Sequence, residues 1–282
     1  MTTKNDTAKL HEIGFAQYRE LPELNFSVAK YIKDCPRKMR SVQQHGIKTT
    51  TAMELGTAVH TAVLEPNLFK RQYKQGLAAV RRGTKAWNEH AEKFPKAITL
   101  KHAEYREVTE MRDSVMSNVD AKNLLNTPQS KGGFTESSMT WVDETTGLDL
   151  KCRIDKMIVG DDDHVIIDLK TTADASPRAM SNRMVQAPFH YLLQMAWYQR
   201  GFEAVFGEKP RAVIVAIEKS VGYPTAVYDI APTDMDFAQA EISEMLDMIT
   251  TAYDEDGEGH YHRQMLDLPK WWYLDSTEED NI

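Results

Sequence analysis

The sequence has 282 residues, of which 41% are hydrophobic and 27% are charged, and this is the composition of a globular protein. Its net charge of −8 and its two cysteines, Cys35 and Cys152, argue against a broad basic surface, a disulfide framework, a four-cysteine zinc site and an iron–sulfur cluster. No apolar run approaches the roughly 20 residues of a membrane span, and the start MTTKNDTAKLHE lacks the apolar core of a secretory signal, so we expect a cytoplasmic protein without membrane contact.

The first half of the chain has the pattern of helices. Residues 25–40 read as a helix with Ser27 as its N-cap. Residues 52–64 carry an apolar stripe and should form a second helix, whose extension Pro66 limits. Residues 101–125 suit a long amphipathic helix. We therefore predict a helical N-terminal part.

The second half alternates strands with helices. Strands are expected at 133–144, 147–160, 164–172, 211–220 and 225–231, and helices at 186–206 and 233–253. This order predicts an α/β protein with a central mixed sheet flanked by helices. The expected domains are an N-terminal arm (1–24), a single domain (25–269) with a helical part (25–128) and a sheet core (129–252), and an acidic tail (270–282).

Two of the expected strands form a hairpin in which residues of like charge fall opposite each other. If residues 160–163 are the loop, Asp155 falls opposite Asp168 and Arg153 falls opposite Lys170. Directly opposed residues have Cβ atoms about 4.5–5.5 Å apart, and like charges there are destabilising. The other face of the hairpin is mostly apolar and suits a core, with the pairs Ile154–Leu169, Lys156–Ile167 and Ile158–Val165.

Two carboxylates held this close must share a proton, recruit cations or bind a metal ion. Oxygen ligands without a Cys or His cluster favour Mg²⁺ or Mn²⁺ over zinc. Lys170 projects to the same side as Asp168, where it can orient a water or stabilise negative charge on a phosphate. The alternative is a set of ordinary ion pairs on a solvated sheet face, but Asp168 stands in VIIDLKTT, among residues suited to burial. The pattern therefore favours metal-assisted phosphodiester hydrolysis.

Several motifs together resemble the PD-(D/E)XK nuclease superfamily. The segments ELGTAVHTAVLEP, CRIDKMIV, IIDLKTT and LLQMAWY are similar to the RecB-like branch, and within it to the exonuclease VIII (RecE-type) nucleases of phages and prophages. The resemblance covers about residues 25–269. The sequence departs from the name-giving motif in one respect, because Ile154 stands where the proline would precede Asp155.

The resemblance implies a role for each residue that matches a family motif. Asp155 and Asp168 would be metal ligands and Lys170 the catalytic lysine. Further family positions are His60 and the Leu169 carbonyl at the metal, and Glu136 as a supporting acidic residue. Gln194 and Tyr198 belong to the Q-x-x-x-Y element; they share a helical face and can both reach the site or the DNA.

The resemblance also implies an activity and partners. It implies a Mg²⁺-dependent enzyme of a bacterial host cell, active also with Mn²⁺, that degrades the 5′-ended strand of linear duplex DNA and leaves 3′ overhangs for recombination. It implies a ring-shaped homo-oligomer, a trimer or tetramer, and a single-strand annealing protein as partner. Two rivals stay open: an endonuclease on the same fold, and a catalytically silent DNA-binding or scaffold protein.

Some basic residues are candidates for contacts with DNA. Arg81, Arg82 and Lys85, together with Arg153, are expected to contact phosphates, because such contacts need localised rather than net positive charge. The pair His260 and His262 is expected to be a solvated loop, and Trp271 and Trp272 are expected to pack against the domain or a neighbouring subunit rather than stack on bases.

Overall fold

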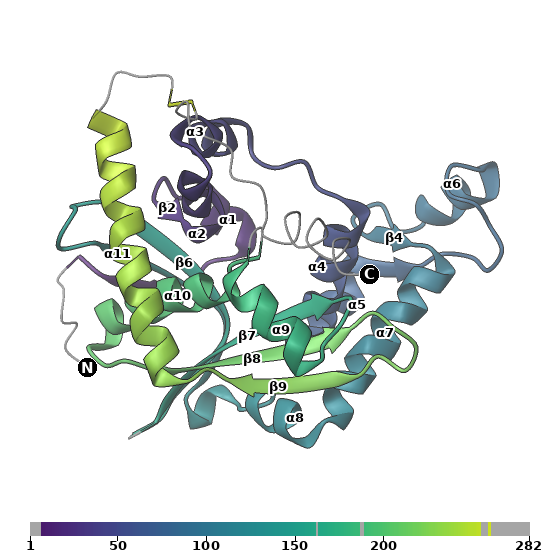
Figure 1. Cartoon of the computed structure of the whole chain (residues 1–282). Helices are drawn as coiled ribbons and strands as arrows, with labels where there is room; N and C mark the ends of the chain where they lie inside the picture. Colours follow the sequence, from purple (N-terminus) through teal and green to yellow (C-terminus); the bar gives the residue numbers. More distant parts are fainter. Residues whose placement is uncertain (1–6, 162, 187–188, 255–258, 261–282) are drawn as a thin grey trace, which may run out of the picture.

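A computed structural model describes residues 7–161, 163–186, 189–254 and 259–260, and Figure 1 shows a mixed β-sheet with helices on both faces. The strands are β1 (Lys9–His11), β2 (Leu24–Asn25), β3 (Tyr73–Gln75), β4 (Ile98–Leu100), β5 (Gly133–Val142), β6 (Asp149–Val159), β7 (His164–Thr172), β8 (Arg211–Glu218) and β9 (Thr225–Asp229). The helices are α1 (Phe15–Glu20), α2 (Phe26–Ala29), α3 (Pro36–His45), α4 (Thr51–Leu64), α5 (Pro66–Gln72), α6 (Lys85–Ala91), α7 (His102–Ser117), α8 (Val119–Leu125), α9 (Pro177–Val185), α10 (Tyr191–Phe206) and α11 (Pro232–Asp254), with 3₁₀ turns at Lys30–Lys33 and Gln129–Lys131.

The main sheet has the strand order β1-β5-β6-β7-β8-β9, and β2 pairs with β6 outside this path. The predicted meander β5–β6–β7 is antiparallel, β7 and β8 are parallel, and β9 is antiparallel to β8. Parallel strands need a crossover, which α9 and α10 supply here. The predicted α/β fold with a central mixed sheet flanked by helices is therefore confirmed.

The predicted hairpin register is right where β6 and β7 pair, from Val159 opposite His164 to Lys156 opposite Ile167. The ladder ends there, so the expected pairs of Asp155 with Asp168 and of Arg153 with Lys170 are absent from it. The side of β6 that faces away from β5 changes its partner in this region. Leu150 and Lys151 pair with β2, and pairing with β7 begins only at Lys156. Asp155 lies in the interval between the two partners.

The side-chain alternation of β6 also breaks at this interval. Cys152, Ile154 and Met157 all belong to one hydrophobic cluster, although Ile154 and Met157 are three residues apart and a regular strand would point them to opposite faces. The expected contact of Ile154 with Leu169 is therefore wrong, because Leu169 belongs to the cluster on the other face of the sheet. The break lies at Asp155, which has no partner in the pairing of β6 with β5 or with β7.

The sheet separates two hydrophobic clusters. One cluster joins α2, α10 and α11 to the sheet, with Trp197 and Phe202 of α10 fully buried in it. The other joins α4, α7 and α8 to β7 and β8, with Val59, Met111 and Val213 fully buried. This three-layer arrangement places α4 and α10 on opposite faces of β7.

Two predicted helices are interrupted, and a third begins later than predicted. The expected helix over 25–40 is split into α2, a 3₁₀ turn and α3, and its N-cap is Asn25 rather than Ser27, since the Asn25 side chain accepts from the Val28 N–H. The expected helix over 101–125 breaks at Asn118, whose side chain caps α8 through the Ala121 N–H. The expected helix from residue 186 begins only at Tyr191, after His190 in a left-handed conformation (φ 49°).

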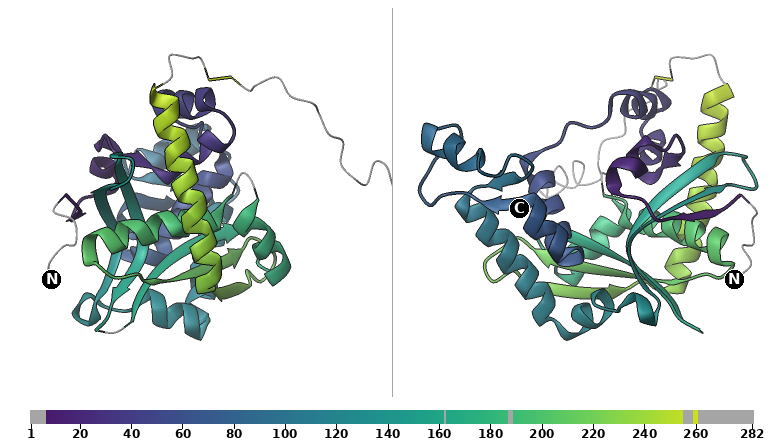
Figure 2. Two further views of the ribbon diagram at one scale, coloured as in Figure 1. Left: turned by 60° about the vertical axis from the view of Figure 1, so that its left-hand side comes forward. Right: turned by 180° about the vertical axis from the view of Figure 1, so that it is seen from behind.

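Residues 70–101 form a small lobe that the sequence did not predict. The parallel strands β3 and β4 pair in a sheet of their own, and α6 packs beside them. Figures 1 and 2 show α6 projecting away from the body of the molecule. Among the described residues, no helix combines the length and apolar character needed to cross a bilayer.

Candidate active site

Lys170 is the centre of a chain of polar contacts from β7 to α10. Its Nζ lies 2.6 Å from Asp168 Oδ2 and donates to Gln194 Oε1 at 2.7 Å. Gln194 Nε2 in turn donates to Tyr198 Oη at 2.6 Å. The side chains of Asp168 and Lys170 are only 2% and 15% exposed, so the alternative of ion pairs on a solvated sheet face is wrong. The spacing of Gln194 and Tyr198, one turn apart, places both in this chain of contacts, as expected.

Asp155 and His60 reach the same region from β6 and α4. Asp155 Oδ2 accepts a hydrogen bond of 2.8 Å from the Leu169 N–H, which is free because the β6–β7 ladder has ended. His60 Nδ1 lies 3.5 Å from the same oxygen. A Cβ at Gly56 would lie 3.2 Å from Thr171 Oγ1, so the glycine one turn before His60 allows α4 to lie close to β7. The Leu169 N–H donates to Asp155, and a hydrogen bond of His60 with the Leu169 backbone raises the pKa of the imidazole, against the larger effect of burial. The expected role of the Leu169 carbonyl as a metal ligand stays a prediction.

Glu136 and Arg153 form the outer side of the site. Glu136 interrupts β5 with a φ of 53°, a conformation that costs a non-glycine residue about 1–3 kcal/mol. Its Oε2 lies 2.7 Å from Arg153 Nε, and Arg153 Nη1 also donates to Ile13 O at 3.0 Å and Ser138 Oγ at 2.7 Å. The Arg153 side chain is 11% exposed and its guanidinium is engaged within the protein. The geometry therefore gives no support to the expected DNA contact of Arg153 and makes it the partner of Glu136.

The electrostatics of the site are those of crowded carboxylates in a buried place. Burial, followed by the charge of Asp168, raises the pKa of Asp155 to about 7, against the opposing effect of Lys170 and the Leu169 N–H. Burial, followed by the charge of Asp155, raises the pKa of Glu136 to about 7, and Arg153 opposes this. Without another cation, the site therefore resists carrying its full negative charge at neutral pH.

His60 and Lys170 are shifted in opposite directions. Burial lowers the pKa of His60, although Asp168 opposes it, so the imidazole is neutral at pH 7 and can act as a ligand. Burial also lowers the pKa of Lys170, but Asp168 and Asp155 outweigh burial and the net pKa is raised. Lys170 is therefore a fixed ammonium at neutral pH.

The donor atoms fit a hard divalent cation in their chemistry. Asp168 Oδ2 is buried and has no well-aligned hydrogen bond, its contact with Lys170 being an ion pair, so it has lone pairs to offer. Within the part of the chain that the structure describes, no three His, Cys, Asp or Glu side chains are already grouped to hold an ion. Mg²⁺ commonly binds through one or two carboxylates and keeps several waters, so Asp155 and Asp168, with His60 beside them, match its needs.

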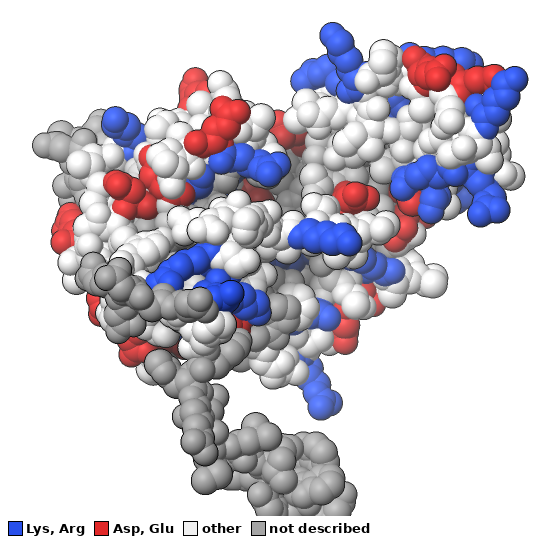
Figure 3. All heavy atoms as spheres, turned by 90° about the horizontal axis from the view of Figure 1, so that it is seen from above, with Lys and Arg blue, Asp and Glu red and all other residues white. Residues whose placement is uncertain are grey.

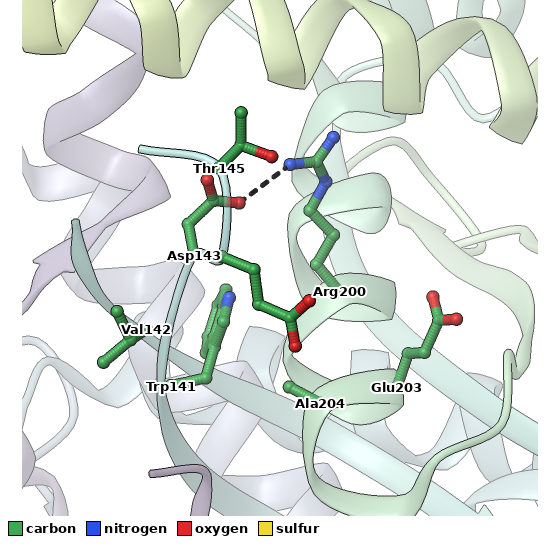
Figure 4. A pocket seen from close by; sticks show the side chains of 8 residues that line it. Trp141, Val142, Asp143, Thr145, Arg200, Glu203 and Ala204 are labelled. Atoms are coloured by element: carbon green, nitrogen blue, oxygen red, sulfur yellow. Dashed lines mark hydrogen bonds and ion pairs between the residues drawn. The ribbon is translucent and has the colours of Figure 1, made fainter. Parts of the chain in front are cut away.

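Two cavities are lined by residues of β5 and of the neighbouring elements. One of about 520 Å³ opens beside Glu136 and Arg153 and extends to residues 10–14. The other, of about 280 Å³, is shown in Figure 4, where Asp143 and Arg200 point towards each other. Arg200 is bound there to Asp143 at 3.3 Å and to Gln239 and Ser243 of α11, which makes it a link between β5 and the helices rather than part of the site.

The remaining expected residues lie elsewhere. Arg81, Arg82 and Lys85 are exposed on the lobe of residues 70–101 and take no part in the contacts that join Asp155, Asp168 and Lys170. Arg82 is paired with Glu104 at 2.9 Å. His260 is exposed, whereas His262, Trp271 and Trp272 are outside the described residues. Sequence reasoning missed Tyr191, whose ring centroid lies 4.8 Å from Lys170 Nζ. Its position three residues before Gln194, on the same helical face, was the available signal.

Comparisons with known proteins bear on the fold and the family of the chain, not on the individual residues of the site. No curated protein sequence matches the chain. A candidate exonuclease from Eubacterium rectale shares 15% identity with a TM-score of 0.57, over 94% of this chain and 96% of that one, a likeness that shows a common fold. A protein from Vibrio cholerae matches with 12% identity and a TM-score of 0.29, over 88% of this chain and 58% of that one. The model of the PDDEXK-like domain of unknown function matches residues 25–261, and the chain belongs to this family.

Proposed function

We propose that this protein is a Mg²⁺-dependent exonuclease that degrades linear duplex DNA from its 5′ ends and leaves 3′ single-stranded overhangs for recombination. The observation that carries the proposal is Lys170, held between Asp168 at 2.6 Å and Gln194 at 2.7 Å, with Asp155 and His60 beside it. Family membership and the structural likeness to a candidate exonuclease support it. The finer assignment to the RecB-like branch and to exonuclease VIII rests on the motifs around these residues.

Each side chain has a part in this proposal. Asp155 and Asp168 hold the cation, and neutral His60 stands where it can complete the ligand set. A bound divalent cation supplies Lewis-acid polarisation of the phosphate and lowers the pKa of a bound water. Lys170, as an ammonium, orients the attacking water and stabilises charge on the phosphate oxygens. Gln194 and Tyr198 fix the direction of the lysine, and Arg153 holds Glu136 at the edge of the site.

The proposal includes partners. An enzyme that stays on one DNA end while it hydrolyses many phosphodiesters benefits from encircling the duplex, and we propose a homo-oligomeric ring, a trimer or tetramer. The 3′ overhang it leaves is the substrate of a single-strand annealing protein, which we propose as its partner. Sedimentation of the protein with and without duplex DNA tests the ring.

Digestion of matched linear and closed-circular duplexes tests the function. With Mg²⁺ or Mn²⁺, a linear duplex labelled at its 5′ ends should release the label early, whereas the same DNA as a closed circle should stay intact. EDTA should stop the reaction. Cutting of the circle would assign the endonuclease rival, early release of a 3′ label would reverse the polarity, and the absence of any metal-dependent cleavage would leave the silent DNA-binding rival.

Tyr191 provides a separate test of the lysine's role. A cation–π contact contributes about 0.5–2 kcal/mol, so Tyr191→Leu should free Lys170 and lower the cleavage rate by up to about 30-fold. Tyr191→Phe keeps the ring and should restore the rate. Because Tyr191 acts through Lys170, the loss should appear in kcat rather than KM. A leucine variant with the wild-type rate, or a phenylalanine variant as slow as leucine, would contradict this.

A further inference from the structure

Positive charge is concentrated in one small part of an acidic protein. Residues 70–101, the lobe built from β3, α6 and β4, contain nine Lys or Arg and two Glu, a net charge of +7, so the other 250 residues carry −15 to give the chain's −8. Figure 3 shows Lys and Arg gathered around this lobe, at the right of the view. A local surplus of this size attracts a polyanion even though the whole protein is negative.

The lobe is a firm platform for these charges. Its base is anchored in the hydrophobic cluster around α4 and α7, where Phe69 stacks on Tyr73 with ring centroids 5.2 Å apart and meets Tyr105 at 5.4 Å. Within the lobe, Trp87 is buried against Gly76, where a Cβ would approach the indole ring to 2.6 Å. Since α5 continues directly from α4, the lobe is attached to the helix that carries His60.

Most of the lobe's cations are exposed, and several have no acidic partner. Arg82 and Lys101 contact Glu104, and Lys85 is 3.8 Å from Glu89. Five exposed residues lack an ion pair with any described carboxylate: Lys70, Arg71, Arg81, Lys93 and Lys96. Unpaired cations on a rigid surface keep their charge available for phosphates.

The lobe offers charge without a stacking surface. Proteins that hold single strands combine cations with exposed aromatic rings on which bases stack. In residues 70–101, all of which are described, Tyr73 and Trp87 are buried and Phe94 is half-buried. The exposed large hydrophobic side chains of this range are the aliphatic Leu77 and Ile98. Charge of this kind suits the regular phosphate backbone of a duplex.

We propose that the lobe of residues 70–101 is a clamp for double-stranded DNA, which holds the duplex by its phosphates while the β6–β7 site acts on the end. This inference rests on the proposed function for its substrate and adds a second binding surface, separate from the metal site. Because contact is to the backbone, the clamp is independent of sequence.

Salt-dependent binding in EDTA tests the clamp without any cleavage. The lobe variant Arg71→Gln/Arg81→Gln/Lys93→Gln/Lys96→Gln is compared with wild type by fluorescence anisotropy of a labelled blunt duplex, over about 50–200 mM salt. The slope of log K against log salt is negative, and each lost phosphate contact reduces its magnitude by about 0.9. The magnitude of the slope should therefore fall by about 2–4, and Kd at about 100 mM salt should rise at least 10-fold.

A matched variant removes the same charge outside the lobe: Lys9→Gln/Lys122→Gln/Lys131→Gln/Lys209→Gln, all at exposed positions. It should keep most of the wild-type slope. An unchanged slope in the lobe variant, an equal loss in the matched variant, or a loss confined to single-stranded DNA would each overturn the clamp. Wild-type protein that binds duplex in EDTA through the lobe but never cleaves it with Mg²⁺ would refute the proposed function and leave the clamp standing.

Discussion

Lys170→Ala is expected to lower the cleavage rate of linear duplex DNA by about 10²–10⁴-fold while DNA binding persists. The ammonium lies 2.6 Å from Asp168 Oδ2 and is held by Gln194, so the substitution removes the positive charge that contacts this carboxylate directly. The substitution also leaves Asp168 buried without its partner, which destabilises the fold by on the order of 3 kcal/mol. Added Mg²⁺ or Mn²⁺ should therefore raise the Tm of Lys170→Ala more than that of wild type.

Lys156→Met is the matched control, because Lys156 is a buried lysine of the same hairpin that has no ion pair with a carboxylate among the described residues. Its Nζ donates to Thr127 O at 2.7 Å and to Thr135 Oγ1 at 3.2 Å, and the residue is 4% exposed. This variant should lose stability yet cleave DNA at nearly the wild-type rate. If Lys170→Ala cleaved as fast as Lys156→Met under conditions where both are folded, the role given to Lys170 would be wrong.

The elements that the sequence predicted well are those with local signals. The strands β5 to β9 have β-branched and aromatic runs bounded by turn residues, and a loop at 160–163 fixes the register of β6 and β7. The Q-x-x-x-Y spacing predicted the face of α10 that meets Lys170, because one turn of helix fixes where both side chains point.

What the sequence could not predict depends on tertiary contacts. Where the β6–β7 ladder has ended, β6 pairs instead with β2, and a two-residue strand has no pattern of its own in the sequence. Glu136 adopts its left-handed conformation where the β5–β6 register skips it, between Thr135 and Ser137, and its side chain pairs with Arg153, seventeen positions along the chain. Arg153 donates a hydrogen bond to the carbonyl of Ile13, which contributes to its burial. No local sequence pattern predicts this contact, because the two residues are far apart in the chain.

Asp155→Asn and Asp168→Asn are both expected to lower cleavage by at least about 100-fold, since each removes a proposed ligand of the cation. Their effects on the stability of the metal-free protein should be opposite. Asn at position 155 can still accept from the Leu169 N–H, and it removes a carboxylate whose pKa burial and Asp168 raise to about 7. Asn at position 168 removes the negative charge that lies 2.6 Å from the Lys170 ammonium, and the buried ammonium then lacks its ion-pair partner.

The pH dependence separates the two variants. An unfolded aspartate has a pKa of about 4, whereas folded Asp155 has about 7, so between these values the folded protein binds more protons and wild-type stability falls as pH rises. In EDTA, Asp155→Asn should therefore exceed wild type in Tm above pH 7 and lose this advantage as pH falls towards about 4.

The charge of Asp168 raises the pKa of Lys170, against the effect of burial. The stabilisation that this ion pair gives to the folded protein is therefore fully present below the pKa of an unfolded lysine, about 10.4. Asp168→Asn should accordingly be less stable than wild type throughout pH 5–8. Thermal unfolding of the three proteins across this range, with and without Mg²⁺, tests the prediction. If the two carboxylates were equivalent, both variants would change Tm in the same direction at each pH, whereas a carboxylate with a raised pKa and a carboxylate in an ion pair should change it in opposite directions.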